Sequence, residues 1–126
     1  MDGIPSFFQV KKTEEYLRIK GKIMLDREQN LVDLDGAQLK NKFDVFNVFS
    51  SALHFPRFFG EDWSAFTDCL RDLSWLANKN TAVLLRNAGQ LDSALLESLT
   101  DALEEARSMW AEEDVNFDVY LFEGEI

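Results

Sequence analysis

The chain has 126 residues, of which 46% are hydrophobic and 13% aromatic, so it can form one core and does not have the composition of a disordered protein. It carries 13 basic and 23 acidic residues, and the formal net charge of −10 argues against direct nucleic-acid binding, which needs the opposite sign. No apolar run approaches the roughly 20 residues that a membrane-spanning helix needs.

The compartment is indicated by the first residues and by the cysteine content. Residues 1–5 lack the basic and apolar regions of a signal peptide, and Cys69, the one cysteine, has no partner for an intramolecular disulfide. We therefore expect a cytoplasmic protein that is monomeric when free and has no membrane contact.

Residues 1–30 form an extension with short apolar clusters. Residues 7–10, 16–19 and 22–25 alternate or cluster like short strands, with a turn at residues 20–22. We expect the extension to add edge strands, for example a hairpin, to the sheet of the following core. An arm that contacts a partner is the alternative.

The next segment has the pattern of a strand, a turn and a helix. Residues 31–34 predict a short strand, and Asp35-Gly36 is a turn signal. Asn41 can cap a helix over residues 42–53, whose apolar stripe comprises Phe43, Phe46, Val48 or Phe49, and Leu53.

A second helix is predicted from Glu61 onward. Pro56 ends the preceding element, and Gly60 supplies a permissive backbone position before the helix starts. One face of this helix is apolar, with Trp63, Phe66, Cys69, Leu70 and Leu73. The other face is small and acidic, with Glu61, Ser64, Ala65, Asp68 and Asp72.

The remaining elements complete an α/β order. The continuous apolar run at residues 81–85 is typical of a parallel strand that is covered on both faces. A helix capped by Asp92 or Ser93 follows, with a stripe of Leu95 or Leu96, Leu99, Leu103, Ala106, and Met109 or Trp110. Residues 117–122 predict the last strand. The chain is thus expected to be a single domain, 1–126, with a three-stranded parallel sheet flanked by helices over residues 31–122.

Catalytic signatures are weak in this sequence. His54 is the only histidine and Cys69 lies on an apolar stripe, so a zinc site with the usual ligands cannot be assembled. No serine lies in a strained elbow motif, so a catalytic triad has little support, and no glycine-rich phosphate loop is present. A row of carboxylates at helical spacing, Glu97, Asp101, Glu104 and Glu105, could bind a hard cation or serve acid–base chemistry. A solvated helix face explains this row more simply, so we expect a non-enzyme without metal or cofactor.

The stretch FPRFFGEDWSAFTDCL resembles the loop and second helix of the barstar family of intracellular ribonuclease inhibitors. The matching features are Pro56, the aromatic pair Phe58 and Phe59, Gly60-Glu61, Ala65, and Asp68-Cys69-Leu70. With the order of elements, the resemblance covers roughly residues 31–122. Two features depart from the family, which usually has tyrosines at the aromatic pair and an additional acid at the position of Ser64.

The resemblance implies an inhibitor of a cationic ribonuclease toxin that blocks the active site with an acidic helix face. It assigns Asp68 to the active-site cleft, Phe58 and Phe59 to the rim beside it, and Glu105 to a supporting position. Gly60, Glu61 and Ser64 complete the expected partner-binding surface. The alternatives are an immunity or regulatory module for a different toxin, which need not be a nuclease, and a small carboxylate-based or metal-assisted enzyme.

Overall fold

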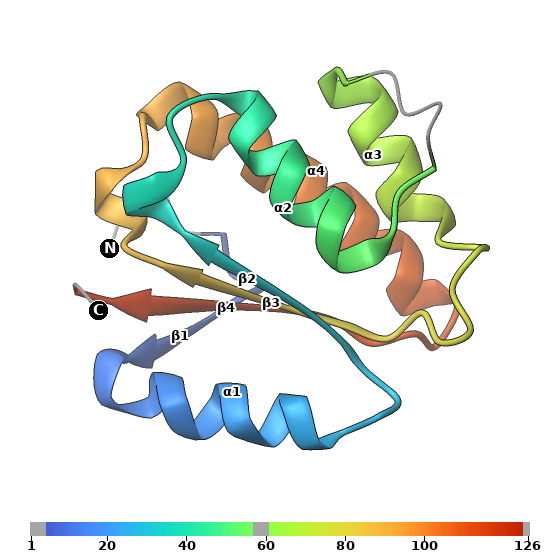
Figure 1. Cartoon of the computed structure of the whole chain (residues 1–126), viewed down its shortest axis with the longest axis horizontal. Coiled ribbons are helices and arrows are strands. Elements are labelled where there is room, and N and C mark those ends of the chain that lie inside the picture. Colours follow the sequence, from blue (N-terminus) through green and yellow to red (C-terminus); the bar gives the residue numbers. More distant parts are fainter. Residues whose placement is uncertain (1–4, 57–60, 125–126) are drawn as a thin grey trace.

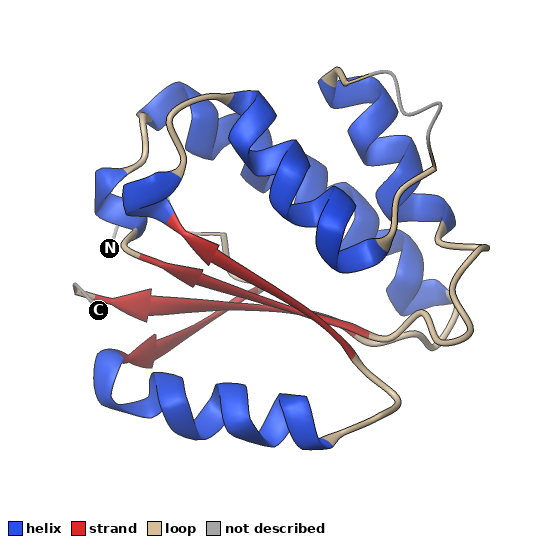
Figure 2. Ribbon diagram, in the orientation of Figure 1, coloured by secondary structure: helices blue, strands red, loops and turns tan. Residues whose placement is uncertain are grey.

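The computed structural model of the chain describes residues 5–56 and 61–124. Four parallel strands form one sheet in the order β1-β4-β3-β2 (Figures 1 and 2). The strands are β1 (Phe8–Lys12), β2 (Asn30–Asp35), β3 (Thr81–Arg86) and β4 (Phe117–Glu123). Val83 is in register with Val32 on one side and Val119 on the other, and Val119 with Phe8, so one apolar row crosses the sheet.

Helices cover both faces of the sheet. The helix α1 (Tyr16–Leu25) lies alone on one face, and three helices cover the other face (Figure 1). These three are α2 (Lys42–Leu53), α3 (Trp63–Asp72) and α4 (Ser93–Glu112). The first five residues of β3 are all buried, as the continuous apolar run predicts for a strand with helices on both sides.

The helices α2 and α4 begin as the sequence predicts, whereas α3 begins at Trp63, two residues after the predicted start at Glu61, because Asp62 is its cap. The Asn41 side chain accepts hydrogen bonds from the backbone N–H groups of Phe43 and Asp44, at 3.0 and 3.2 Å, and so caps α2. Asp92 caps α4 in the same way. A polar side chain that satisfies free N–H groups fixes the first residue of each helix.

The extension differs from the expected strands. It contributes one edge strand, β1, and then the 3-10 turn Thr13–Glu15 and α1 in place of strands at residues 16–19 and 22–25. Tyr16, Ile19 and Ile23 are buried against Ala82, Leu84 and Phe122 of the sheet. Their spacing of three and four residues is that of one helix face. The segment therefore forms a helix and not the strands that its short apolar clusters suggested. Gly21 lies within this helix and does not form a turn. The hairpin prediction is therefore wrong, whereas the added edge strand is confirmed.

A half-buried polar network joins α1 to the sheet. The Tyr16 hydroxyl donates a hydrogen bond to the Asp33 carboxylate, which also accepts from Lys20 Nζ at 2.9 Å and from Arg86 Nε at 3.0 Å. The Arg86 guanidinium also lies over the Tyr16 ring, 5.0 Å from its centroid. Two side chains of the extension thus share one carboxylate with β3, which fixes the position of α1.

Candidate functional site

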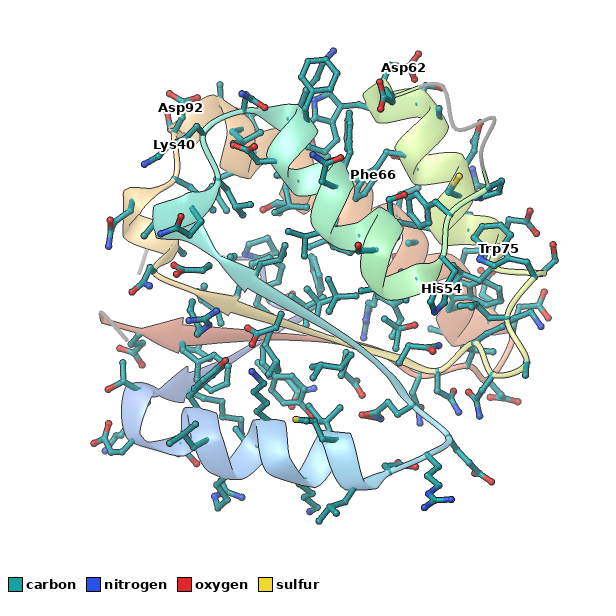
Figure 3. The ribbon with its side chains drawn as sticks, viewed as in Figure 1. Lys40, His54, Asp62, Phe66, Trp75 and Asp92 are labelled. Atoms are coloured by element: carbon teal, nitrogen blue, oxygen red, sulfur yellow. The ribbon has the colours of Figure 1, made fainter. Side chains whose placement is uncertain are left out.

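The helix α3 presents its polar face to solvent because its apolar face is anchored. Phe66 is fully buried, and its ring contacts those of Phe46, Phe49 and Trp63 at centroid distances of 5.0 to 5.5 Å. Asp62 caps the helix by accepting a hydrogen bond from the Ala65 N–H at 2.7 Å; Figure 3 shows Asp62 at the start of α3 and Phe66 further along it.

Two tryptophans hold α3 in place against the neighbouring elements. Trp110 of α4 donates its indole N–H to the Leu70 carbonyl at 2.7 Å, at the carboxyl end of α3. Trp75, in the segment after α3, donates to the Leu53 carbonyl at the end of α2, also at 2.7 Å. Both bonds satisfy carbonyl groups at helix ends and restrict movement of α3 relative to α2 and α4.

A groove of about 310 Å³ runs between α3 and α4. It is lined by Trp63, Ser64, Thr67 and Asp68 from α3 and by Ser98, Asp101, Ala102 and Glu105 from α4. Three of these residues are carboxylates, and Asp68, Asp101 and Glu105 are all exposed. The groove is therefore an open acidic surface that a cationic group can enter.

One of the three carboxylates already has a cationic partner. Arg71 of α3 binds Glu105 of α4 across the groove edge, with 3.2 Å between Nη1 and Oε1. Both side chains are largely exposed, at 43% and 57%, so this ion pair is weak and can be exchanged for a partner's cation.

The residues expected to bind a partner are brought together in part. Ser64, Asp68 and Glu105 line the groove. Glu61 is exposed and precedes α3 with a φ of 57°, a left-handed conformation that costs free energy for a residue with a side chain. Phe58, Phe59 and Gly60 lie outside the described residues.

Asp101 is the groove residue that the expected partner-binding surface lacked. The carboxylate row on α4 divides in the structure: Asp101 and Glu105 line the groove, whereas Glu97 and Glu104 do not. Ser98, Asp101 and Glu105 are three and four residues apart, as on one helix face, but Glu97, Asp101 and Glu104 have the same spacings, so spacing alone does not predict this division. No pattern in the sequence indicates which face of this helix meets α3.

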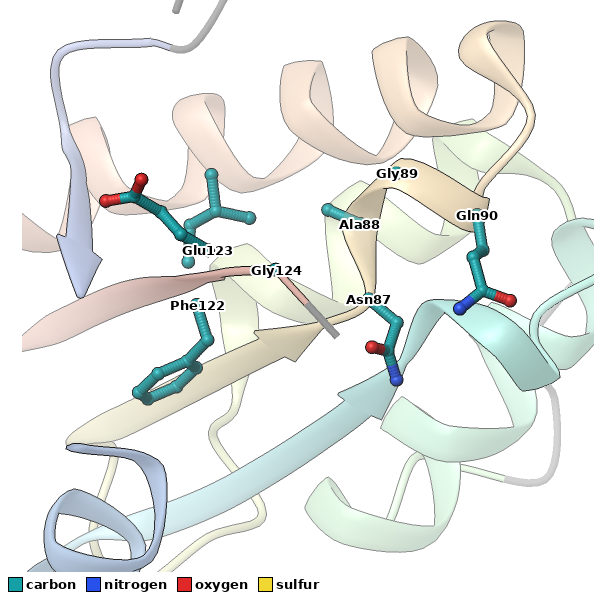
Figure 4. A pocket seen from close by; sticks show the side chains of 8 residues that line it. Asn87, Ala88, Gly89, Gln90, Phe122, Glu123 and Gly124 are labelled. Atoms are coloured by element: carbon teal, nitrogen blue, oxygen red, sulfur yellow. The ribbon is translucent and has the colours of Figure 1, made fainter. Parts of the chain in front are cut away.

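A second cavity lies where the parallel strands β3 and β4 end (Figure 4). Its lining consists of Asn87, Ala88, Gly89, Gln90, Leu121, Phe122, Glu123 and Gly124. Ligands of α/β proteins often bind at this edge of a sheet. Glu123 is the only ionisable side chain in the lining, so the cavity has no pair of groups for acid–base or nucleophilic catalysis.

Within residues 5–56 and 61–124, no three His, Cys, Asp or Glu side chains are grouped so as to hold a metal ion. His54 is exposed at the carboxyl end of α2, where it has a φ of 53°. Over the same residues, none of the helices has the length and apolar character needed to cross a membrane.

Comparison with known proteins identifies the family. No curated protein matches the chain. The sequence profile of the family described as Barstar (barnase inhibitor) matches residues 29–122, which include the groove-lining residues of both helices. Since this match covers most of the chain, the protein belongs to the barstar family of barnase inhibitors.

Proposed function

We propose that the protein inhibits a cationic ribonuclease toxin by inserting the acidic surface between α3 and α4 into the toxin's active site. Family membership supports the inhibitor role, and the family description indicates a binding protein rather than an enzyme. The observation that carries the proposal is that Asp68, Asp101 and Glu105 line one groove in a member of this family.

The proposed mechanism is imitation of the substrate's charge. A ribonuclease holds phosphate groups with arginine and lysine side chains, and carboxylates can occupy the same positions through charge-assisted hydrogen bonds. In the described part of the chain, Asp68 and Asp101 have no salt bridge, so both are free to accept such bonds. The anchored apolar face of α3 keeps the carboxylates in position, which lowers the conformational entropy lost on binding.

The test is an RNA-cleavage assay with candidate cationic ribonucleases, followed by titration of the one that is inhibited. Asp68→Ala should weaken binding by about 2–5 kcal/mol, the range measured when one partner of a buried charge pair is truncated, barnase–barstar being among the examples. Asp118→Ala removes an acidic residue on the α1 side of the sheet and should leave affinity nearly unchanged. Equal affinities for the wild type and both variants would remove Asp68 from the binding surface.

The assay also distinguishes the alternative target. The groove lacks the acid that the family usually has at the position of Ser64, and a partner's cation must displace Arg71 from Glu105. These features favour a partner that differs from barnase. Binding to a toxin without nuclease activity, with no effect on any ribonuclease tested, would support an immunity module for that toxin and contradict ribonuclease inhibition.

A further inference from the structure

A separate groove of about 310 Å³ lies on the opposite side of the sheet, between α1 and the strands β1 and β4. Its lining residues are Gln9, Lys11, Arg18, Ile19, Lys22, Ile23, Asp26, Gln29 and Tyr120. Most of them belong to the extension, before the segment matched by the barstar family. This groove is therefore made by the residues that the extension adds to the fold.

The charge of this groove is opposite to that of the molecule as a whole. Lys11, Arg18 and Lys22 line it together with one acid, Asp26, in a chain whose net charge is −10. The Asp26 carboxylate accepts a hydrogen bond from the Glu28 N–H at 2.9 Å and keeps its charge, so the lining has three positive charges against one negative charge. Arg18 binds Glu15 at 2.8 Å, but Lys11 and Lys22 form no salt bridge with any described residue.

Five of the other cations in the described chain have a partner. Lys20, Arg71 and Arg86 bind carboxylates, and Lys42 and Arg107 lie over the rings of Phe43 and Phe7. The remaining cations of the described chain, Lys12, Arg27, Lys40 and Lys79, likewise form no salt bridge with a described residue, but they do not line this groove. Lys11 and Lys22 do line it, and the acid with which Lys11 interacts electrostatically, Glu15, already binds Arg18. That arrangement leaves positive charge available to a ligand.

Neutral donors lie beside the cations. Tyr120 stands in register with Gln9, its side chain is half-buried, and its hydroxyl makes no hydrogen bond with any described residue. Burial, and then the nearby Asp118 carboxylate, raise the pKa of Tyr120, so the hydroxyl keeps its proton and can donate it. Gln29 adds an amide, and Ile19 and Ile23 form an apolar wall. A concave apolar surface with a few converging polar groups is the usual form of a small-ligand site.

We propose that this groove binds the phosphate group of a small phosphoester, with Lys11 and Lys22 holding the charge and the Tyr120 hydroxyl donating a hydrogen bond. A phosphate dianion matches two ammonium groups in charge and accepts hydrogen bonds from several donors at once. The groove is large enough for a small phosphoester, and the source of that group is either a nucleotide or a glycerol phosphate headgroup.

The experiment is calorimetric titration of the whole protein with four probes at constant ionic strength: inorganic phosphate, AMP, glycerol 3-phosphate and adenosine. The phosphorylated probes should bind saturably and adenosine should not. Tighter binding of AMP than of glycerol 3-phosphate identifies a nucleotide as the source, and the reverse order identifies the headgroup. No saturable binding of any phosphorylated probe, or equal binding of adenosine and AMP, overturns the proposal.

Variants locate the binding. Lys11→Gln with Lys22→Gln should weaken binding of the phosphorylated probes by at least about tenfold, because the loss of one hydrogen bond to a charged group already has an effect of that size. The matched control, Lys40→Gln with Lys79→Gln, removes the same charge outside the groove and should bind as the wild type does. Tyr120→Phe, which keeps the ring, should weaken binding by a smaller factor. Equal weakening in the two double variants would mean that only the overall charge matters, which also overturns the proposal. The Lys11, Lys22 and Tyr120 variants should inhibit a ribonuclease as well as the wild type does. The test of phosphate binding and the test of the proposed function can therefore fail independently.

Discussion

Arg71 limits how acidic the groove between α3 and α4 can be. Arg71 belongs to α3 and forms an ion pair with the groove carboxylate Glu105, at a distance of 3.2 Å. Arg71→Ala should therefore speed association with a cationic partner and tighten binding, because Glu105 no longer has to exchange one cation for another. The change in unfolding free energy should be within about 1 kcal/mol, as for other exposed ion pairs.

A matched control separates this local effect from the change in net charge. Arg107→Ala also removes one positive charge from the helical layer, but Arg107 lies over the Phe7 ring and binds no groove acid. Association rates of the two variants can be compared by stopped-flow mixing with the same partner. An equal increase in the association rate of both variants would mean that breaking the ion pair between Arg71 and Glu105 has no effect beyond the change in net charge.

Gly36 is required by the close approach of two strand ends. A Cβ atom at this position would lie 2.2 Å from the carbonyl oxygen of Asn87, which is backbone and cannot rotate away. Gly36→Ala should lower the unfolding free energy by about 1–3 kcal/mol, the cost of overpacking a well-packed position. Gly21→Ala in α1 should raise it by about 0.5–1 kcal/mol, because a Cβ there has open space and the helix gains from alanine. Urea denaturation measures both, and effects of the same sign would contradict this account.

The elements after residue 30 were predictable because each has one dominant signal. The buried run of β3, the caps Asn41 and Asp92, and the apolar stripe of α3 specify strand and helices without knowledge of their neighbours. Residues 16–25 were predicted as strands and not as a helix. The helix has exposed apolar residues, Leu17, Met24 and Leu25, which make the short segment look like two apolar strands. Which apolar residues of α1 are buried is known only from their packing against the sheet face formed by Ala82, Leu84 and Phe122.

The contact between α1 and the sheet should depend on pH through Asp33. Burial by itself would raise the pKa of this carboxyl group, but the hydrogen bonds from Tyr16 and Lys20, with the charge of Arg86, hold the pKa below its ordinary value of 3.8. A depressed carboxyl pKa stabilises the fold above the unfolded value, and this stability is lost as the pH falls through the folded pKa. We therefore expect the network to weaken below about pH 4.

Lys20 sets the corresponding limit at alkaline pH. Its hydrogen bond to Asp33, and then that to Tyr16, raise its pKa above the ordinary 10.5, so its contribution is full below that value and is lost as the pH rises through the folded pKa. Asp33→Asn should cost about 1–3 kcal/mol near neutral pH, because cations are left without their partner, and should reduce the acid-induced loss of stability. Thermal unfolding between pH 2 and pH 7 measures the effect, and an unchanged acid profile in Asp33→Asn would assign that loss to other carboxylates.

The proposed binding surface was less predictable than the fold, because it depends on two helices that are distant in sequence. Asp68 and Glu105 were expected from the family resemblance, and both line the groove. The ion pair of Arg71 with Glu105 joins residues 34 positions apart, and no local pattern indicates it. The role of Asp101 likewise depends on which face of α4 meets α3.

The molecule as a whole should be steered toward a cationic partner. Acidic and basic residues balance over residues 1–40, so the net charge of −10 arises from residues 41–126, which include both helices of the acidic groove. Added salt should slow association much more than it speeds dissociation, since the Debye length falls from about 10 Å at 0.1 M to about 3 Å at 1 M. Surface plasmon resonance at several salt concentrations measures both rates. An association rate that does not change with salt would rule out steering.

The position of β4 in the sheet has a consequence for how the protein is made. This strand follows all the others in sequence, yet it lies between β1 and β3 and pairs with both. During synthesis, β1 and β3 therefore leave the ribosome before β4, the strand that joins them. The amino-terminal part of the chain cannot complete the sheet before β4 is available. If the protein acts as the proposed inhibitor, it becomes competent late, after β4 has left the ribosome. In a cell that produces a toxin at the same time, protection would depend on inhibitor that was already folded before the toxin appeared.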